Sequence, residues 1–326
     1  MDGVTDHPCR LMMAKIGHPD LMYTEFVAVE GLAAGALRLL DDLRFSPEEQ
    51  PLIAQFFGTD PGAFYQAAVI AGYLGFSGVD INMGCPAKDV AARGAGAGLI
   101  KTPELASQII RQTESGIRDF SQGITAQEAG LAPKLIARLP EPTDRRRLGL
   151  SVKTRLGVVE DTSESWITHL AQTGVEQITL HGRTLKQMYG GVADWDAIAL
   201  AKRRLSQFPV RLFGNGDLQS RAEALAKIEL YQLDGALIGR AAIGNPWAFI
   251  DTVPSYKARI ETAIMHAKLH STLKSDAQFG SMRKHLFDYT KGFPGAKHVR
   301  LQLNDIHCLE DVERILNDKQ ILNPVE

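Results

Sequence analysis

Short apolar runs alternate with longer amphipathic segments along most of the chain. The apolar runs suit strands buried on both faces, and they predict seven strands, at residues 21–24, 52–57, 79–83, 150–154, 177–181, 210–213 and 235–238. Helix-like segments lie between them, among others at residues 61–74, 103–113, 164–173 and 220–228. Repeated strand–helix units of this kind indicate an α/β fold with a parallel sheet.

The number of predicted strands is one short of the commonest parallel barrel, which has eight. From about residue 254 the strand signals stop, whereas helix-like segments continue to the end of the sequence. We therefore expect residues 1–253 to form a TIM (β/α)8-type barrel from which the first strand is missing. Residues 254–326 are expected to form a small helical domain.

Charge, cysteine spacing and the distribution of apolar residues exclude several classes of protein. The 326 residues carry a formal net charge of -2, so an RNA partner would have to be held by a local basic patch. The three cysteines are far apart and form no C-x-x-C pair, which fits neither a disulfide framework nor a zinc site. The sequence has no long apolar run and no signal-peptide pattern. These features predict a cytoplasmic protein with no membrane partner and no metal site.

Polar and glycine residues gather just past six of the predicted strands. They are Gln55 and Gly58, residues 82–86, Lys153 and Arg155, residues 181–183, residues 215–217, and Gly239 and Arg240. A single histidine or lysine at a strand end is more often structural than catalytic. Because the carboxyl ends of barrel strands converge on one mouth, their recurrence favours an active site.

Two of these clusters suit a phosphate group. The segments "GNGD" (residues 214–217) and "IGRAAIGNP" (residues 238–246) follow the last two predicted strands, where such barrels often bind phosphate through backbone N–H groups. Arg240 offers a guanidinium to the phosphate oxygens. Lys153 offers a positive charge to an electron-rich ring such as a reduced flavin. A flavin mononucleotide (FMN) would use both features.

Seven segments carry a resemblance to a known family: "MDGVTDHPCR", "AQFFGTDP", "VDINMGCPAKDV", "SVKTRLG", "TLHGRTLKQMYGGVADW", "GNGDL" and "GALIGRAAIGNPWAF". In their order and spacing the chain resembles the bacterial-type tRNA-dihydrouridine synthases over nearly its whole length. The resemblance implies an FMN-binding barrel followed by a helical tRNA-binding domain, with NADPH as reductant. The implied reaction reduces the C5–C6 double bond of uridines in tRNA to 5,6-dihydrouridine.

The resemblance also implies roles for single residues. Cys85 matches the proton donor of the family, and Asn82 and Arg183 match positions beside the substrate uracil. The matching FMN contacts are Met1, Gln55, Lys153, His181, Asn215, Asp217, Gly239 and Arg240. A buried packing residue is the usual interpretation of a lone cysteine. The place of Cys85 after a strand, between Gly84 and Pro86, favours the catalytic acid instead, and an unperturbed thiol with a pKa of about 8.5 is mostly protonated at neutral pH.

The chain departs from the family pattern in three places. The family motif normally begins with an apolar strand ending in Ala-Pro-Met, so we expect the missing strand to lie upstream of residue 1. Cys9 stands where an aromatic residue is usual, which we interpret as a packing change. Residues 117–149 are longer than the usual connection and are predicted to form a surface insertion, in which Arg145, Arg146 and Arg147 solvate a loop rather than contact RNA.

A basic patch in the helical region is the predicted tRNA contact. Between residues 283 and 300, Arg283, Lys284, Lys291, Lys297 and Arg300 stand against one acid, Asp288, with the aromatic residues Phe287, Tyr289 and Phe293 among them. Cations neutralise phosphates and aromatic rings stack on bases. We predict contacts from Lys284, Lys291, Lys297 and Arg300. Without the family resemblance, a solvated charged helix would be the preferred interpretation.

Two other functions stay open at this point. One is a different FMN barrel oxidoreductase acting on a small pyrimidine, such as a dihydroorotate or dihydropyrimidine dehydrogenase, although this leaves the helical domain without a role. The other is a non-catalytic tRNA-binding protein. The sequence favours a monomeric synthase, and no short motif encodes which uridine is modified.

Overall fold

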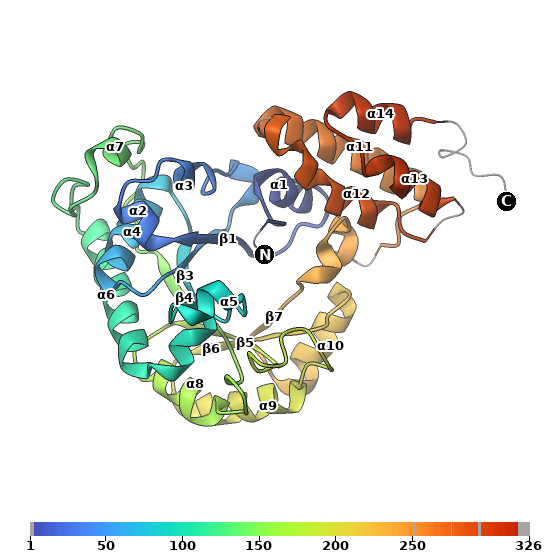
Figure 1. Cartoon of the computed structure of the whole chain (residues 1–326). Helices are drawn as coiled ribbons and strands as arrows, with labels where there is room; N and C mark the ends of the chain where they lie inside the picture. Colours follow the sequence, from blue (N-terminus) through green and yellow to red (C-terminus); the bar gives the residue numbers. More distant parts are fainter. Residues whose placement is uncertain (1–2, 251, 275, 293–294, 319–326) are drawn as a thin grey trace.

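The structure is a computed structural model that describes residues 3–250, 252–274, 276–292 and 295–318. Its sheet contains seven parallel strands whose spatial order is the order of the chain. They are β1 (Met22–Ala28), β2 (Leu52–Phe57), β3 (Gly78–Met83), β4 (Gly149–Arg155), β5 (Gln177–His181), β6 (Arg211–Asn215) and β7 (Gly235–Leu237). The sheet curls as in a barrel, and among the described residues it stays open between β1 and β7 (Figure 1). The predicted α/β barrel-type fold is confirmed.

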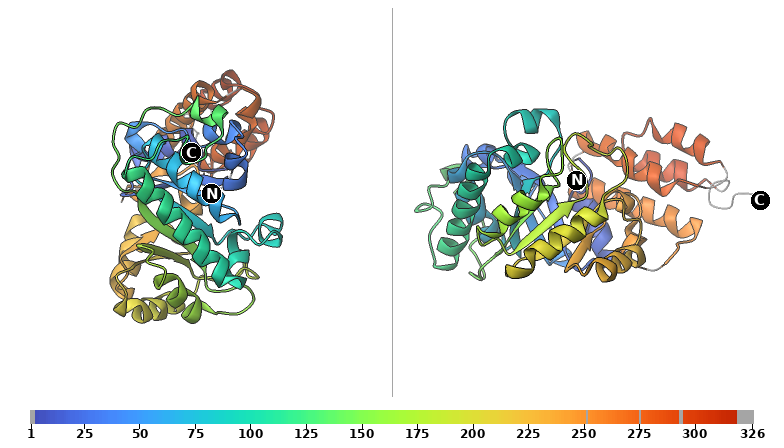
Figure 2. Two further views of the ribbon diagram at one scale, coloured as in Figure 1. Left: turned by 90° about the vertical axis from the view of Figure 1, so that its left-hand side faces the viewer. Right: turned by 90° about the horizontal axis from the view of Figure 1, so that it is seen from below.

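Helices cover the outside of the curled sheet (Figures 1 and 2). They are α1 (His7–Ile16), α2 (Val29–Ala33), α3 (Arg38–Asp41), α4 (Pro61–Leu74), α6 (Pro103–Ser121), α7 (Pro133–Ile136), α8 (Ser163–Ala171), α9 (Trp195–Arg204) and α10 (Arg221–Tyr231). The short helix α5 (Lys88–Ala92) instead follows the loop after β3 and has no buried residues. Helix α4 illustrates how the sequence sets the boundaries. The Asp60 carboxylate accepts the N–H groups of Gly62 and Ala63 at its start, and Gly75 ends it with a φ of 82° that favours glycine.

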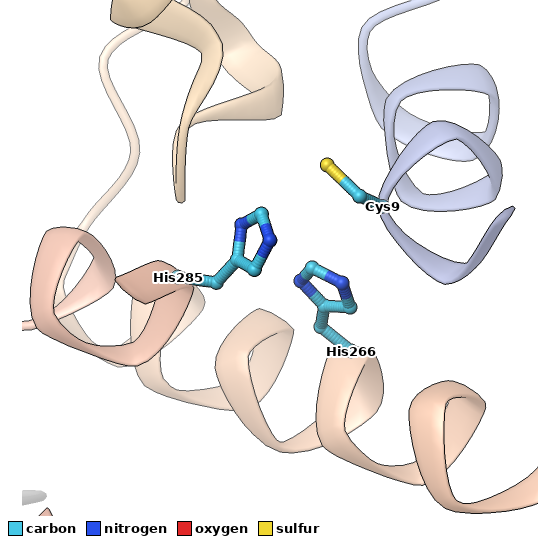
Figure 3. A group of neighbouring side chains, drawn as sticks. All are labelled: Cys9, His266 and His285. Carbon is cyan, nitrogen blue, oxygen red and sulfur yellow. The ribbon is translucent and has the colours of Figure 1, made fainter. Parts of the chain in front are cut away.

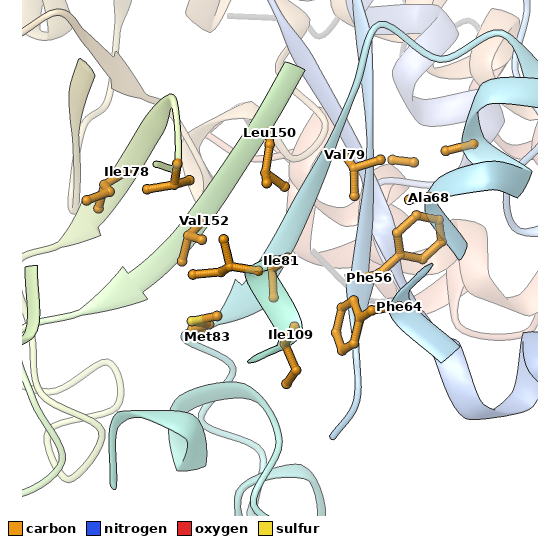
Figure 4. Close-up of a cluster of buried hydrophobic side chains, with 14 of the residues drawn as sticks. Phe56, Phe64, Ala68, Val79, Ile81, Met83, Ile109, Leu150, Val152 and Ile178 are labelled. Atoms are coloured by element: carbon orange, nitrogen blue, oxygen red, sulfur yellow. The ribbon is translucent and has the colours of Figure 1, made fainter. Parts of the chain in front are cut away.

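The central strands have one apolar and one polar face. On β3, Val79 and Ile81 alternate with Asp80 and Asn82, all of them buried. Figure 4 shows apolar side chains of β2, β3, β4 and β5 packed with residues of α4 and α6. Those labelled are Phe56, Phe64, Ala68, Val79, Ile81, Met83, Ile109, Leu150, Val152 and Ile178. Because side chains alternate across a strand, the polar residues are on the opposite, inner face.

The predicted insertion begins inside a helix, since α6 continues to Ser121 and the irregular part follows it. Arg145 donates to the carbonyls of Phe120 and Ile124 at 3.0 and 3.1 Å. Arg147 pairs with Glu114 and Glu176, and Arg146 lies 3.8 Å from Asp144. These arginines therefore have partners within the protein, and the expectation that they do not contact RNA stays a prediction.

Four helices form a second cluster after the barrel: α11 (Tyr256–Leu273), α12 (Arg283–Tyr289), α13 (Ala296–Leu303) and α14 (Leu309–Leu316). They surround a hydrophobic core of their own that includes Ile260, Leu286, Leu303 and Val312. Helix α1 of the barrel packs against α11, as Figure 1 shows. Of the helices in the described residues, none has the length and apolar character needed to cross a bilayer.

Candidate active site

Strand register brings the predicted site residues to one rim of the sheet. Asn82 is paired with Lys153 across β3 and β4, and His181 is paired with Arg155 on one side and Asn215 on the other. Asn215 in turn pairs with Leu237, two residues before Gly239. The loops after five consecutive strands therefore open at the same level, which is the active-site end of a barrel.

Asn82 organises the loop that carries Cys85. Its side-chain oxygen accepts the N–H of Gly84 at 3.0 Å and that of Cys85 at 2.8 Å. This is the local turn that asparagine side chains favour. The Cys85 side chain is partly exposed at the rim. Asn82, predicted to contact substrate, thus also holds the backbone of the predicted catalytic residue in place.

A buried relay of hydrogen bonds supports Asn82 from below. The Asn82 amide donates to the Gln55 side-chain oxygen at 3.1 Å, and the Gln55 amide donates to Asp80 at 2.8 Å. Asp80, which is completely buried, also accepts the Ser151 hydroxyl at 2.6 Å. The prediction missed Asp80, although a carboxylate in the middle of an otherwise apolar strand was an available signal. Gln55, a predicted FMN contact, is a middle link of this relay.

Burial raises the pKa of Asp80 to about 6, against the hydrogen bonds from Ser151 and Gln55 and the charge of Lys153. Because the pKa of this carboxyl is 3.8 in the unfolded chain, its ionisation destabilises the fold above about pH 6, and that cost is relieved as the pH falls.

Lowering the pH from 7 to 5 should therefore stabilise the wild-type protein relative to Asp80→Asn by about 1 kcal/mol, or about 2–4 °C in Tm. Thermal unfolding of both proteins at pH 5, 6 and 7 measures this change. The comparison with the variant cancels the contributions of all other titrating groups. A Tm difference that is the same at every pH would contradict the assigned pKa.

Lys153 and His181 give the rim its charge. Burial and the neighbouring Arg155 lower the pKa of Lys153 to about 8, with Asp80 and Cys85 acting in the opposite direction. Lys153 thus remains mostly cationic at neutral pH. Burial, followed by the charges of Lys153, Arg155 and Arg183, lowers the pKa of His181 to about 2. His181 is therefore a neutral imidazole that donates or accepts hydrogen bonds.

Arg183 is held by partners inside the protein. Its side chain is 2% exposed and makes two parallel hydrogen bonds to Asp217, at 2.9 and 2.7 Å. It also donates to the carbonyls of Gly190 and Gly191. In this arrangement Arg183 fixes the loop after β5 against Asp217, and its predicted contact with uracil stays a prediction.

Arg155 has a similar bridging role that the sequence did not reveal. It is buried and donates to the Gly84 carbonyl at 2.7 Å. It also donates to the carbonyls of Thr184 and Met188 at 3.2 and 3.1 Å. The loop that carries Cys85 is thereby connected to the loop after β5.

The ends of β6 and β7 leave space that suits a phosphate. A Cβ added at Gly239 would meet no atom within 4 Å, so its backbone faces open space. The Arg240 side chain is 52% exposed and donates to Asp217 at 2.9 Å, and Gly216 adopts a φ of 142° that favours glycine. Asn215 donates to the carbonyl of Leu237 and joins the two strand ends. The residues present therefore fit the phosphate of a mononucleotide.

A shallow groove of about 570 Å³ on the second helical cluster collects the predicted tRNA contacts. Its lining residues are Ile243, Lys284, Phe287, Asp288, Lys291, Lys297, Arg300, Leu301 and Asn304. All four predicted cations are among them. Tyr289 is only 1% exposed and belongs to the core, so it is not placed to stack on a base. The predicted roles of Met1 and Phe293 lie outside the described residues.

Comparison with known proteins identifies a family for this chain. Residues 1–119 and 132–325 match the family model described as dihydrouridine synthase (Dus), and the unmatched stretch lies within the predicted insertion. A probable tRNA-dihydrouridine synthase of Staphylococcus aureus (strain COL) is 30% identical over 98% of this chain and 90% of that protein. The probable tRNA-dihydrouridine synthase 2 of Bacillus subtilis (strain 168) is 30% identical over 98% of this chain and 91% of that protein.

Among solved structures, DHODH from Eimeria tenella in complex with ferulenol is similar over 68% of this chain and 58% of that chain, at 11% identity and a TM-score of 0.43. The family match and the two relatives at 30% identity are the stronger findings. They confirm the resemblance drawn from the seven sequence segments. The chain belongs to the dihydrouridine synthase family.

Proposed function

We propose that this protein reduces the C5–C6 double bond of uridines in tRNA to give 5,6-dihydrouridine, with FMN as cofactor and NADPH as reductant. The observation that carries the proposal is the Cys85 loop, organised by Asn82, at a rim that also bears the Lys153 cation and the open space at Gly239. We place this chemistry in residues 1–253, tRNA contacts in residues 254–326, and the protein as a monomer in the cytoplasm.

The described residues can hold FMN at both ends. Arg240 and the backbone at Gly239 would bind the phosphate, since a guanidinium forms charge-assisted bonds to phosphate oxygens. Lys153 and the neutral His181 would contact the polar edge and phosphate side of the flavin, and Gln55 would contact the ring. When bound, the flavin supplies a hydride to a carbon–carbon double bond.

Cys85 supplies the proton in this proposal. Hydride addition at C6 of uracil shifts electron density toward C5, and C5 must be protonated before the product is complete. Asn82 fixes the backbone of Cys85, and Arg155 anchors the same loop through the Gly84 carbonyl. A positioned general acid typically contributes about 10²- to 10⁴-fold to the rate.

The basic groove gives tRNA a second point of contact. Lys284, Lys291, Lys297 and Arg300 line it together, and phosphate contacts of this kind dominate the affinity of proteins for nucleic acids. A dehydrogenase acting on a free pyrimidine would have no use for this groove. The groove and the family match together favour the tRNA enzyme over that alternative.

Arg240→Ala should weaken FMN binding by about 10- to 100-fold, because it removes a charge-assisted contact worth about 1.5–3 kcal/mol. Flavin fluorescence during dialysis of the purified protein measures the loss. The matched control is Arg204→Ala, since Arg204 is also 52% exposed but pairs with Glu164 away from the rim. Equal flavin retention in both variants would remove Arg240 from the cofactor site.

The direct test of the function is a map of dihydrouridine in tRNA from cells with and without the gene. Loss of dihydrouridine at particular positions, restored by the wild-type gene, is the expected result. If the Cys85→Ala gene restored dihydrouridine to the same level, the proposed activity would stand, but Cys85 would not be the general acid. An unchanged map, with purified protein that binds tRNA but no flavin, would favour a non-catalytic tRNA-binding protein.

A further inference from the structure

Three side chains capable of binding a metal meet in the interior where the barrel packs against the helical cluster. Cys9 is on α1, His266 on α11 and His285 on α12, and their ligand atoms lie within 4.8 Å of one another. Figure 3 shows the thiol and both imidazole rings gathered around one point. Their exposed fractions are 2%, 1% and 3%. At this depth each polar atom depends on partners within the protein.

Two imidazole nitrogens in this cluster lack such partners. Within the described part of the chain, His266 Nε2 and His285 Nδ1 are buried and make no hydrogen bond. The other nitrogen of His266 lies 3.4 Å from the Tyr289 hydroxyl. His266 thus resembles a metal-binding histidine, in which one nitrogen is held by the protein and the other is left for the ion.

We propose that Cys9, His266 and His285 bind one Zn²⁺ ion. A thiolate and two imidazoles are typical zinc ligands, whereas magnesium and calcium prefer oxygen ligands. A tetrahedral site with Zn–S of about 2.3 Å and Zn–N of about 2.0–2.1 Å requires ligand atoms about 3.5 Å apart. The three side chains must therefore close by about 1 Å around the ion. The fourth position is left for a water molecule.

Binding is balanced in charge and in protons. The Cys9 sulfur loses its proton to solvent as the metal–sulfur bond forms, each imidazole contributes a lone pair, and nothing is oxidised. The metal and the thiolate together leave one positive charge. The carboxylate of Asp6 accepts the Cys9 N–H at 3.2 Å and pairs with Lys274 at 3.2 Å, so an acidic group lies beside the site.

The site would join two parts of the fold. Cys9 belongs to the first helix of the barrel, whereas both histidines belong to the helical cluster. Helix α12 carries His285 and also Lys284, which lines the basic groove. A bound metal would therefore fix the groove relative to the barrel rim. The sequence predicted no metal site and interpreted Cys9 as a packing change, so this inference revises both expectations and does not depend on the proposed enzymatic function.

Cobalt is a suitable probe, because tetrahedral Co²⁺ absorbs in the visible at wavelengths longer than those of oxidised flavin. The purified protein, stripped of metals with a chelator, is titrated with Co²⁺ and then with Zn²⁺. We expect tetrahedral absorption that saturates at one Co²⁺ per chain and disappears when Zn²⁺ displaces it. Absence of this absorption in the wild-type protein would overturn the proposal, without reliance on any variant.

Variants identify the ligands. Removal of a residue that only orients a ligand costs about 10- to 100-fold in metal affinity, so we expect Cys9→Ser and His285→Gln each to lose at least about 100-fold. Cys308→Ser, which changes a thiol outside the cluster, should bind Co²⁺ like the wild type. Zn²⁺ at about 100 times its Kd should also raise the Tm of the wild type by about 5 °C and leave that of Cys9→Ser unchanged. Equal affinity in Cys9→Ser and wild type would mean that the three residues only pack together.

Discussion

Cys85→Ala should separate the two halves of the proposed reaction. Reduction of the bound flavin by NADPH needs no acid at the uracil, so its rate should stay near that of the wild type. Reoxidation of the reduced enzyme by tRNA requires protonation of C5 and should slow by about 10²- to 10⁴-fold, while the affinity for tRNA changes little. Stopped-flow absorbance of the flavin measures both rates in the same protein.

Two further variants sharpen this test. Cys85→Ser should be nearly as slow as Cys85→Ala, because a hydroxyl is a far weaker acid than a thiol. Cys308→Ser should reoxidise at the wild-type rate, since Cys308 lies in the helical cluster and contacts Asp311. Normal reoxidation of Cys85→Ala by tRNA would show that Cys85 is a packing residue and that the proton comes from elsewhere.

Replacement of Lys284, Lys291 and Lys297 by alanine should weaken tRNA binding and flatten its dependence on salt. Each phosphate contact contributes about 0.7–0.9 to the slope of log affinity against log salt concentration, so three lost contacts should reduce the slope by about 2–3. Binding measured at several salt concentrations gives the slope. Oxidation of NADPH without tRNA should be unaffected.

The experiment must distinguish the loss of phosphate contacts in the groove from a disturbance of the fold, because Lys284 also donates to the Gly3 carbonyl at 2.5 Å. The double variant Lys291→Ala/Lys297→Ala keeps that bond and should show about two thirds of the effect on the slope. A matched control replaces Lys15, Lys257 and Lys268, which are 42%, 72% and 56% exposed and do not line the groove. A slope equally reduced in the control would assign the effect to net charge rather than to the groove.

The strand pattern predicted the fold, and it also predicted the site, because each apolar run is followed by polar residues that meet at the same level of the sheet. This is why Lys153, His181 and Asn215 were expected at one rim, and the register places them there. The pattern does not specify which of the cationic side chains form hydrogen bonds with other groups of the protein. Arg155 and Arg183 look equivalent to Lys153 in the sequence, yet both are buried and bonded to backbone carbonyls.

Contacts between distant segments were also beyond the pattern. Cys9 belongs to the first helix, and its neighbours His266 and His285 come from the last part of the chain, at no spacing that a metal-binding motif would show. In the sequence Tyr289 is one of several aromatic residues in a basic stretch. Only the packing of the helices shows that it belongs to the hydrophobic core. In both cases the decisive information is how helices from distant parts of the chain pack against one another.

The hydrogen bonds of the relay beneath Asn82 all run from donor to acceptor in one direction, toward Asp80. An ionised Asp80 carboxylate requires this direction. An ionised Asp80 can only accept hydrogen bonds, so Gln55 must present its NH2 group to Asp80 and its oxygen to Asn82. Asn82 must then direct its own oxygen toward the Cys85 N–H. The orientations of these two amides, which lie one and two hydrogen bonds from Asp80, thus match a single charge. Once Asp80 is protonated below about pH 6, it can donate as well as accept, and the direction of the relay is then held from the other end alone, by the Gly84 and Cys85 N–H groups that donate to Asn82. The protonation state of Asp80, a residue in the middle of a strand, would then contribute to how firmly the cysteine loop is held.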